Sequence, residues 1–421
     1  MTRKISLWTA SLLVLALFLG AAAQAQDQYR LVAGPMEDGF YADKAVIAFS
    51  PSADSTATLT WGAAGGRLDH TVTINGAPVA RNDFGAPVYR TEITNLSPDK
   101  VYSYDLKIQE TGGAGTAGYT GGSFRTAPVA ARSFAFAVWG DNGSKEPNYA
   151  AKSGWPAVSK AMAADAAVEL VATVGDLVGW NSPTNGDTEW ETRFTLPARD
   201  LLAHKPMLFA QGNHDGHSGS KPVADPYAVG LFNLTAPSPN SYYSTWTYGA
   251  ARIVMLDTEA LSAGGAQTVW LEQTLRSAKE AYIFVLAHAT GFSSGPHGVV
   301  NAEGVPYENR VKQYLQGVVP LLEKYGATAA FAGHDHFYER SEKGGVTYVI
   351  YGGGGDSMGD ASNKDYSNHT SGRDPQNPYR KFFKVKTFGY TRVEVGADKA
   401  TIKGVDTSGN VFDSIDLKPR K

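Results

Sequence analysis

The stretch ATAAFAGHDH (residues 327–336) joins an apolar run, typical of a buried strand, to a pair of histidines. Four other apolar runs in the chain also end at Asp, Asn or His, and residues 207–211 form the weakest of them. The five motifs are Asp141-Asn142-Gly143, Gly175-Asp176, Gly212-Asn213-His214-Asp215, Val285-Leu286-Ala287-His288 and Gly333-His334-Asp335-His336. Each motif follows a predicted strand, and strand ends are where open α/β sheets form their ligand sites.

These motifs supply carboxylate, amide and imidazole groups, which suit Zn, Fe, Mn or Ni as ligands. Two metal ions bound close together can share one carboxylate between them. We therefore predict a dinuclear metal site. Its expected ligands are Asp141, Asp176, Asn213, His288, His334 and His336.

At these motifs the chain resembles the calcineurin-like metallophosphoesterases and, within them, the purple acid phosphatases. The family pattern runs DxG, GDxxY, GNH followed by Asp or Glu, VxxH and GHxH, and this sequence matches all of it except the Tyr. Residues 332–340, AGHDHFYER, are similar to the purple-acid-phosphatase form of the last motif. A Gly-Asp pair alone usually marks a turn, but the whole series in family order favours a functional metal site.

The resemblance implies two metal ions, divalent or mixed-valence and drawn from Fe, Zn and Mn. The first would take Asp141, Asp176 and His336, and the second Asp176, Asn213, His288 and His334, with Asp176 shared. Such a pair lowers the pKa of a bridging water and stabilises the charge that develops in an in-line displacement at phosphorus. The resemblance thus predicts hydrolysis by a metal-bridging hydroxide.

Two further histidines, His214 and His297, match family positions that contact the substrate and protonate the leaving oxygen. The resemblance therefore makes both of them candidate catalytic residues. Asp215 lies next to His214 in the chain, and we expect it to orient that ring.

The sequence departs from the family at Gly179, where the pattern places a tyrosine whose phenolate binds ferric iron. Other members compensate with a histidine two residues after the first Asp, but here that position is Gly143. The first metal is left with three assignable protein ligands, as in an open catalytic site. We expect a protein that is not purple and is not strongly selective for Fe(III).

The N-terminal segment predicts export. Arg3 and Lys4 precede an apolar run that is too short to span a bilayer, and residues 23–25 form a small-x-small cleavage site, so residues 1–25 are expected to be a Sec-type signal peptide. The chain contains no cysteine, which excludes disulfides, thiolate ligands and a lipoprotein anchor. We expect a periplasmic or secreted bacterial protein without a membrane anchor.

Charge argues against a nucleic-acid partner. Removing Arg3 and Lys4 with the signal moves the formal net charge from -3 to about -5, and the chain has no basic run or basic helix. The expected partner is therefore a small phosphate ester. The sequence does not indicate the oligomeric state.

The domain organisation follows from a change of pattern. Residues 27–127 alternate short strands with turns, including the turn-rich stretch 111–122, which predicts an all-β sandwich that resembles a fibronectin type III domain. In residues 133–421 strands alternate with helical segments such as 188–202 and 309–325, and C-terminal β-hairpins follow. The expected class is α+β, in which the sandwich precedes a four-layer α/β/β/α metallophosphoesterase domain that the resemblance implies.

Our first hypothesis is an exported, dinuclear-metal phosphoric ester hydrolase, an acid-phosphatase-type monoesterase. A phosphodiesterase or a phospholipid-acting member of the same superfamily is the nearest alternative. A surface-binding protein with an inactive phosphoesterase body is an alternative of another class. Metal content separates the classes, and the preference for a monoester or a diester separates the two enzymes.

Overall fold

The computed structural model describes residues 29–420 except 83, 144–152, 180–188, 218–222, 225, 233–241 and 359–376. The expected signal peptide, residues 1–25, lies outside the described residues. Within the described part of the chain, no helix combines the length and the apolar character needed to cross a bilayer.

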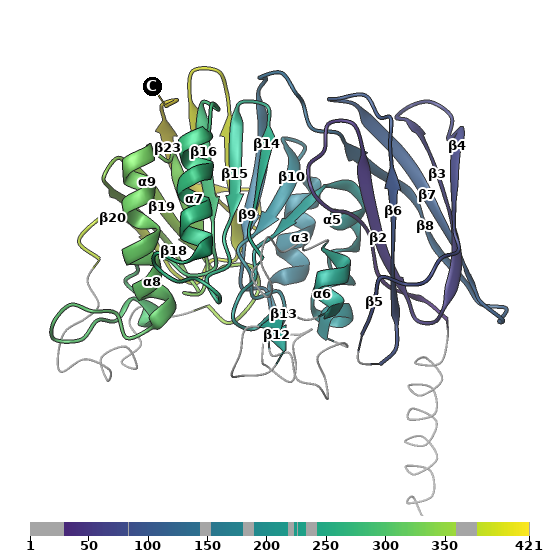
Figure 1. Cartoon of the computed structure of the whole chain (residues 1–421), viewed down its shortest axis with the longest axis horizontal. Helices are drawn as coiled ribbons and strands as arrows, with labels where there is room; N and C mark the ends of the chain where they lie inside the picture. Colours follow the sequence, from purple (N-terminus) through teal and green to yellow (C-terminus); the bar gives the residue numbers. More distant parts are fainter. Residues whose placement is uncertain are drawn as a thin grey trace, which may run out of the picture.

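The N-terminal region is a sandwich of two antiparallel sheets, on the right in Figure 1, with strand orders β1-β2-β6-β5 and β4-β3-β7-β8. Its apolar side chains, among them Phe49, Leu59 and Tyr104, form one core between the sheets. The strands are β1 (Leu31–Glu37), β2 (Ala45–Pro51), β3 (Ser55–Ala63), β4 (His70–Ile74), β5 (Ala80–Arg81), β6 (Pro87–Ile93), β7 (Val101–Glu110) and β8 (Thr116–Arg125).

The prediction of a connecting stretch over residues 111–122 was wrong, because β8 begins at Thr116 and pairs with β7. Glycine often marks a turn, but inside a strand it also marks close approach of another backbone. A Cβ added at Gly118 would lie 2.3 Å from the carbonyl oxygen of Leu106, so glycine here permits close approach of the two strands.

The second region contains two larger sheets packed face to face. Their strand orders are β11-β10-β9-β21-β22-β23 and β14-β15-β16-β17-β19-β18-β20. The strands of the first are β9 (Phe134–Trp139), β10 (Val168–Thr173), β11 (Met207–Phe209), β21 (Gly389–Val395), β22 (Ala400–Asp406) and β23 (Val411–Leu417). Those of the second are β14 (Ser244–Tyr248), β15 (Ala251–Met255), β16 (Tyr282–Leu286), β17 (Ala329–Ala332), β18 (Tyr338–Lys343), β19 (Val346–Tyr351) and β20 (Arg380–Lys384).

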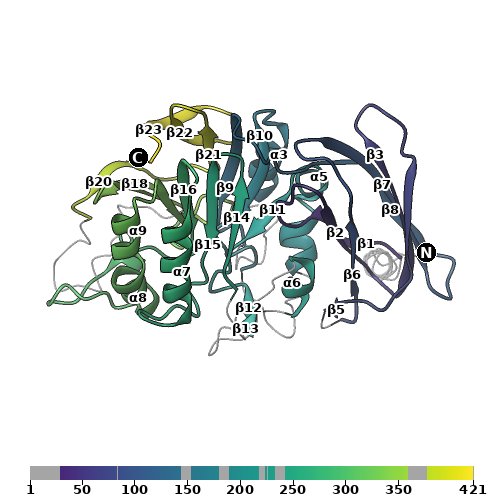
Figure 2. The same cartoon turned by 45° about the horizontal axis from the view of Figure 1, so that its top comes forward.

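An apolar core fills the space between these sheets, in which Phe136 contacts Phe284 and Phe331 at ring-centroid distances of 5.3 and 6.5 Å. Helices cover the outer faces: α3 and α5 pack on the first sheet, and α7, α8 and α9 on the second (Figures 1 and 2). The predicted α/β/β/α layering is therefore confirmed. The C-terminal hairpin strands extend the first sheet beside β9.

The helices are short, and two predicted ones are interrupted. The segment 309–325 divides into α8 and α9 near Pro320, and 188–202 divides into a π-helical turn and α5 around Pro197. Proline lacks the backbone N–H that a helix interior needs. The helices are α3 (Trp155–Ala164), the π-helix η1 (Trp190–Thr195), α5 (Arg199–His204), α6 (Pro226–Leu231), α7 (Ala266–Ser277), the 3-10 turn η2 (Pro296–Gly298), α8 (Asn309–Gly317) and α9 (Val319–Tyr325).

The sandwich is attached to the second region by polar contacts as well as by packing. Arg30 forms a bidentate ion pair with Glu191 at 2.8 Å, and the Tyr104 hydroxyl donates to the carbonyl oxygen of Ala203 at 3.0 Å.

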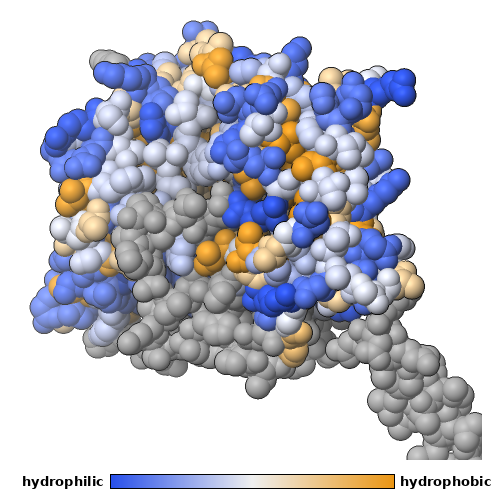
Figure 3. Space-filling view, turned by 45° about the vertical axis from the view of Figure 1, so that its right-hand side comes forward, coloured by the Kyte–Doolittle hydropathy of each residue, from blue (hydrophilic) through white to orange (hydrophobic). Residues whose placement is uncertain are grey.

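On the face seen in Figure 3, hydrophilic residues are interspersed with smaller apolar patches. The division at residues 127–133 remains a prediction.

The strand directions bring the sequence motifs to one place. In the first sheet β9, β10 and β11 are parallel, and in the second β15, β16 and β17 are parallel. The carboxyl ends within each parallel set share an edge. Nδ1 of His288, which follows β16, lies 2.9 Å from the carbonyl oxygen of Val174, which follows β10, so the two edges meet.

Candidate metal centre

The loops after β9 and β10 hold two predicted ligands, Asp141 and Asp176, side by side. The Asp141 N–H donates to Gly175 O at 2.9 Å, and the Gly143 N–H donates to Asp176 O at 3.0 Å. Both carboxylates are buried, with exposed fractions of 0% and 4%. These backbone bonds fix the spacing of the two carboxylates.

Three predicted ligands adopt left-handed backbone conformations. The φ angles are 60° at Asp141, 55° at Asp176 and 71° at His334. Side chains with a Cβ rarely occupy this region, and each such residue costs roughly 1–3 kcal/mol. The motifs did not predict this strain, because Asp and His enter the left-handed region more often than most residues and the surrounding contacts decide where they do so.

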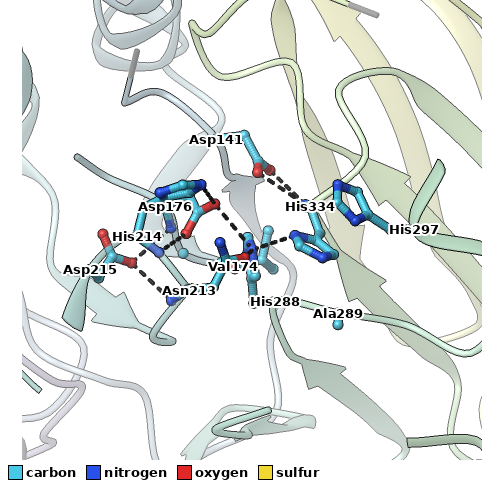
Figure 4. Close-up of polar contacts among 12 residues, drawn as sticks. Asp141, Val174, Asp176, Asn213, His214, Asp215, His288, Ala289, His297 and His334 are labelled. Atoms are coloured by element: carbon cyan, nitrogen blue, oxygen red, sulfur yellow. Dashed lines mark hydrogen bonds and ion pairs between the residues drawn. The ribbon is translucent and has the colours of Figure 1, made fainter. Parts of the chain in front are cut away.

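One group of ligand atoms converges on Nε2 of His288 (Figure 4). This nitrogen lies 2.9 Å from Oδ1 of Asn213, 3.1 Å from Nδ1 of His334 and 3.2 Å from Oδ2 of Asp176. Asp176, His288 and His334 are all buried. The structure thus brings together all four residues predicted for the second metal.

The outer contacts of His288 and His334 determine which ring nitrogen of each histidine directs a lone pair toward this centre. Nδ1 of His288 is 2.9 Å from the carbonyl oxygen of Val174, and Nε2 of His334 is 2.9 Å from a carboxylate oxygen of Glu308. Both partners are acceptors, so the ring protons sit on those nitrogens. The other two ring nitrogens, Nε2 of His288 and Nδ1 of His334, then carry lone pairs and lie beside the oxygen acceptors of Asn213 and Asp176. A cation between these four atoms would be bound by all of them.

The pKa of His288 agrees with this geometry. Burial lowers that pKa, but the charge of Asp176 outweighs burial and raises it to about 10, so the site favours positive charge. Burial raises the pKa of Asp176, yet the His288 charge and hydrogen bond hold it well below its usual value. The donor set therefore fits a metal ion.

The first-metal group is more open. Nδ1 of His336 lies 2.9 Å from the carbonyl oxygen of Ser357, which directs Nε2 toward Oδ1 of Asp141 at 3.5 Å. The backbone N–H of His334 donates to both Asp141 carboxylate oxygens at 3.0 Å. Asp141 and His336 are thus paired as predicted, and the sharing of Asp176 by both metals remains a prediction.

The candidate catalytic histidines lie beside the ligands. The His297 ring stacks on His334 with centroids 3.6 Å apart, and its Nδ1 bonds to Glu308. Nε2 of His214 lies 3.8 Å from Oδ2 of Asp176. Their catalytic roles remain predictions.

Glu308 is the residue that the sequence did not indicate. Its two carboxylate oxygens contact His297 and His334, so one side chain positions a candidate acid and a candidate ligand. The hydrogen bonds to these histidines hold its pKa below its usual value, although burial raises it. Only its place directly before α8 was visible in the sequence, because it belongs to no motif.

Asp215, which we expected to orient His214, accepts hydrogen bonds from the backbone of two loops. Its Oδ2 accepts from the backbone N–H groups of Asp176 at 2.7 Å and Gly212 at 2.9 Å, and its Oδ1 accepts from Leu177 N–H at 2.7 Å. The side chain is 1% exposed. This carboxylate therefore joins the loops that carry Asp176 and Asn213.

The missing tyrosine has no substitute at Gly143. A Cβ there would lie 2.1 Å from the backbone carbon of Val178 and 2.5 Å from the Gly179 nitrogen. A histidine at this position would therefore require the loop after β10 to move. Backbone packing against Val178 and Gly179 therefore leaves no space for a ligand side chain at Gly143, and the three-ligand account of the first metal remains a prediction.

Comparisons with known proteins agree with this geometry. Residues 135–338 match the calcineurin-like phosphoesterase family. The chain is 27% identical over 249 residues to tartrate-resistant acid phosphatase type 5 of Rattus norvegicus, covering 52% of this chain and 69% of the rat protein. It is 29% identical over 202 residues to the purple acid phosphatase of Glycine max, covering 44% of this chain and 40% of the soybean protein.

Among solved structures, the purple acid phosphatase PPD1 from yellow lupin seeds superposes with a TM-score of 0.72 at 18% identity, covering 91% of this chain and 74% of PPD1. PhoD gives a TM-score of 0.65 at 12% identity, covering 92% of this chain and 93% of PhoD. At these identities the likeness concerns the fold. It extends over the sandwich as well as over the two large sheets.

Proposed function

Because the chain is a calcineurin-like metallophosphoesterase related to the purple and tartrate-resistant acid phosphatases, we propose that it hydrolyses phosphate monoesters with two bound metal ions. The supporting observation is the convergence of Asp176, Asn213 and His334 on Nε2 of His288. The outer hydrogen bonds of both histidines direct lone pairs inward, which is the arrangement of metal-binding imidazoles.

Charge favours a phosphate ester as the substrate. The ligand set contains two carboxylates, Asp141 and Asp176, and otherwise neutral groups, so two cations there leave the centre positive. Metal ions bound there would supply Lewis acidity and a hydroxide nucleophile near neutral pH. The buried loops that carry the ligands exclude bulk water from one side of the substrate.

His297 and His214 are proposed to assist the leaving group. Because Nδ1 of His297 is directed at Glu308, Nε2 is the nitrogen left to protonate a leaving oxygen. Stacking on His334 keeps this ring next to the second-metal ligands. His214 approaches from the opposite loop, beside Asp176.

The test is elemental analysis of the purified protein, together with hydrolysis of nitrophenyl phosphate and bis-nitrophenyl phosphate. We expect two metals per chain, loss of activity on chelation, recovery on addition of Zn, Mn or Fe, and faster hydrolysis of the monoester. A protein without stoichiometric metal would favour the surface-binding alternative. Preference for the diester would favour the phosphodiesterase.

We further propose that the protein is exported to the periplasm or beyond, on the basis of the N-terminal sequence. Cell fractionation and N-terminal sequencing of the mature protein test this directly. Cleavage after Ala25 should leave Gln26 as the first residue. A cytoplasmic protein that retains Met1 contradicts the proposal.

A further inference from the structure

A small pocket lies next to the metal centre, between the segment after β15 and the start of α8. Its volume is about 210 Å³, and it is lined by Thr258, Glu259, Leu261, Glu308, Asn309 and Arg310. The sequence assigned no chemical role to any of these residues. A cavity of this volume has room for several water molecules or for one short organic group.

Two contacts place this pocket on the leaving-group side of the centre. Glu308 lines it and also bonds to His297, the candidate acid. Thr258 lines it as well, and its hydroxyl oxygen accepts from the backbone N–H of Ala289 at 3.3 Å, next to the ligand His288. Glu308 therefore connects the pocket to the candidate acid, and Thr258 connects it to the loop that carries His288.

The charges that line the pocket define what it accepts. Nη1 of Arg310 pairs with Glu259, and Nε of Arg310 lies 3.4 Å from Glu308. The side chains of Glu259 and Arg310 are 11% and 26% exposed, so this pair is largely withdrawn from water. The charged residues that line the pocket are two carboxylates and one guanidinium, so their own charges sum to one negative, although Glu308 also bonds to His297 and His334.

We infer that this pocket binds the alcohol portion of the substrate, and that it selects short alcohols carrying further hydroxyl or ammonium groups over those carrying an anion. Hydroxyl and ammonium groups donate to the Glu259 and Glu308 carboxylates, whereas a carboxylate placed there is repelled. The assignment rests on the proposed phosphatase function, because it requires the ester to be positioned for hydrolysis.

Two isosteric substrates test the inference. Glycerol 3-phosphate and 3-phosphoglycerate differ only in the terminal group, which is a hydroxymethyl in one and a carboxylate in the other. We expect kcat/KM to favour glycerol 3-phosphate by about 10- to 100-fold, because like charges repel and the pocket residues Arg310 and Glu308, 26% and 29% exposed, are only partly screened by water. Equal values, or a preference for 3-phosphoglycerate, overturn the inference.

Variants locate the effect in the pocket. Glu259→Gln removes one negative charge and frees Arg310, so the preference should shrink to within about 3-fold, mainly through faster hydrolysis of 3-phosphoglycerate. Asn309→Asp adds a charge at an exposed position on the rim and should widen the preference. Glu272→Gln makes the same change at an exposed ion pair with Lys324 and should change nothing.

The outcomes separate this inference from the proposed function. If neither ester nor nitrophenyl phosphate is hydrolysed by the metal-loaded wild type, the phosphatase function fails and the pocket assignment fails with it. If all three are hydrolysed but Glu259→Gln and Asn309→Asp leave the preference unchanged, only the pocket assignment is overturned. The Asn309→Asp arm remains decisive if Glu259→Gln does not fold, because it alters an exposed residue.

Discussion

The substitution Asp215→Asn should destabilise the fold and weaken metal binding together. Asparagine has the shape of aspartate, but it keeps one acceptor oxygen and turns an NH2 group toward the backbone donors. The less costly amide orientation keeps the bonds from Asp176 and Gly212 and leaves the Leu177 N–H unpaired. The substitution therefore removes the negative charge and one hydrogen bond and leaves the shape of the side chain unchanged.

The expected cost follows from these contacts. Burial raises the pKa of Asp215 to about 7, so at pH 8 the carboxylate is charged, and losing one hydrogen bond to it costs roughly 1.5–3 kcal/mol when the donor stays buried. The two remaining bonds change from charged to neutral, which halves their strength. We expect the free energy of unfolding to fall by about 2–4 kcal/mol, and metal affinity to fall by about 10- to 100-fold, as for other changes that misplace a ligand.

Urea unfolding of the metal-free protein measures the first effect, and metal titration of the folded protein measures the second. Asp165→Asn is the matched control, because Asp165 accepts from Tyr390, Arg392 and the Ala167 N–H away from the metal centre. The control should lose stability and keep its metal affinity. A loss below about 1 kcal/mol in Asp215→Asn with unchanged metal binding would refute the reasoning.

Four further outcomes are expected. Asp176→Asn should lower the occupancy of both metals, whereas Asn213→Ala should weaken mainly one; two retained metals in Asp176→Asn, by elemental analysis, would contradict a shared carboxylate. His297→Ala should slow alkyl phosphates by about 100- to 10,000-fold and nitrophenyl phosphate far less; equal slowing excludes the acid role. Iron-loaded protein should show no phenolate band, because Gly179 replaces the tyrosine; a strong violet absorption would reveal another ligand. Burial raises the pKa of Asp257 to about 6, so the folded state holds this proton when the unfolded chain has lost it. The free energy of unfolding of the wild type minus that of Asp257→Asn should therefore fall by about 2–3 kcal/mol between pH 4 and pH 7, and a flat difference in urea unfolding contradicts this.

The buried strands and the ligand motifs at their ends were predictable because both depend on local pattern, whereas the four-layer arrangement was predicted from the family resemblance. Runs such as Phe134–Trp139 are buried along their whole length, and a ligand that directly follows such a strand has little freedom of position. The parallel strand order then brings the strand ends together, and the predicted ligands with them: Asp141, Asp176, Asn213, His288, His334 and His336.

Glu308 and Arg310 could not be placed in the same way. They lie at the start of α8, after a segment with no periodic pattern, and their position depends on how residues 299–307 fold back. The helix breaks near Pro197 and Pro320 are a different case. Their signals were present in the sequence, because proline interrupts a helix interior even where the apolar pattern continues past it.

The left-handed conformations of Asp141, Asp176 and His334 link metal binding to the stability of the backbone. A chain released from metal binding would become more stable if glycine replaced these residues, because glycine reaches positive φ without steric cost. Glycine at these three positions would therefore remove the backbone cost and the metal-binding atom together, so the strain at each position exists only because a ligand side chain is present.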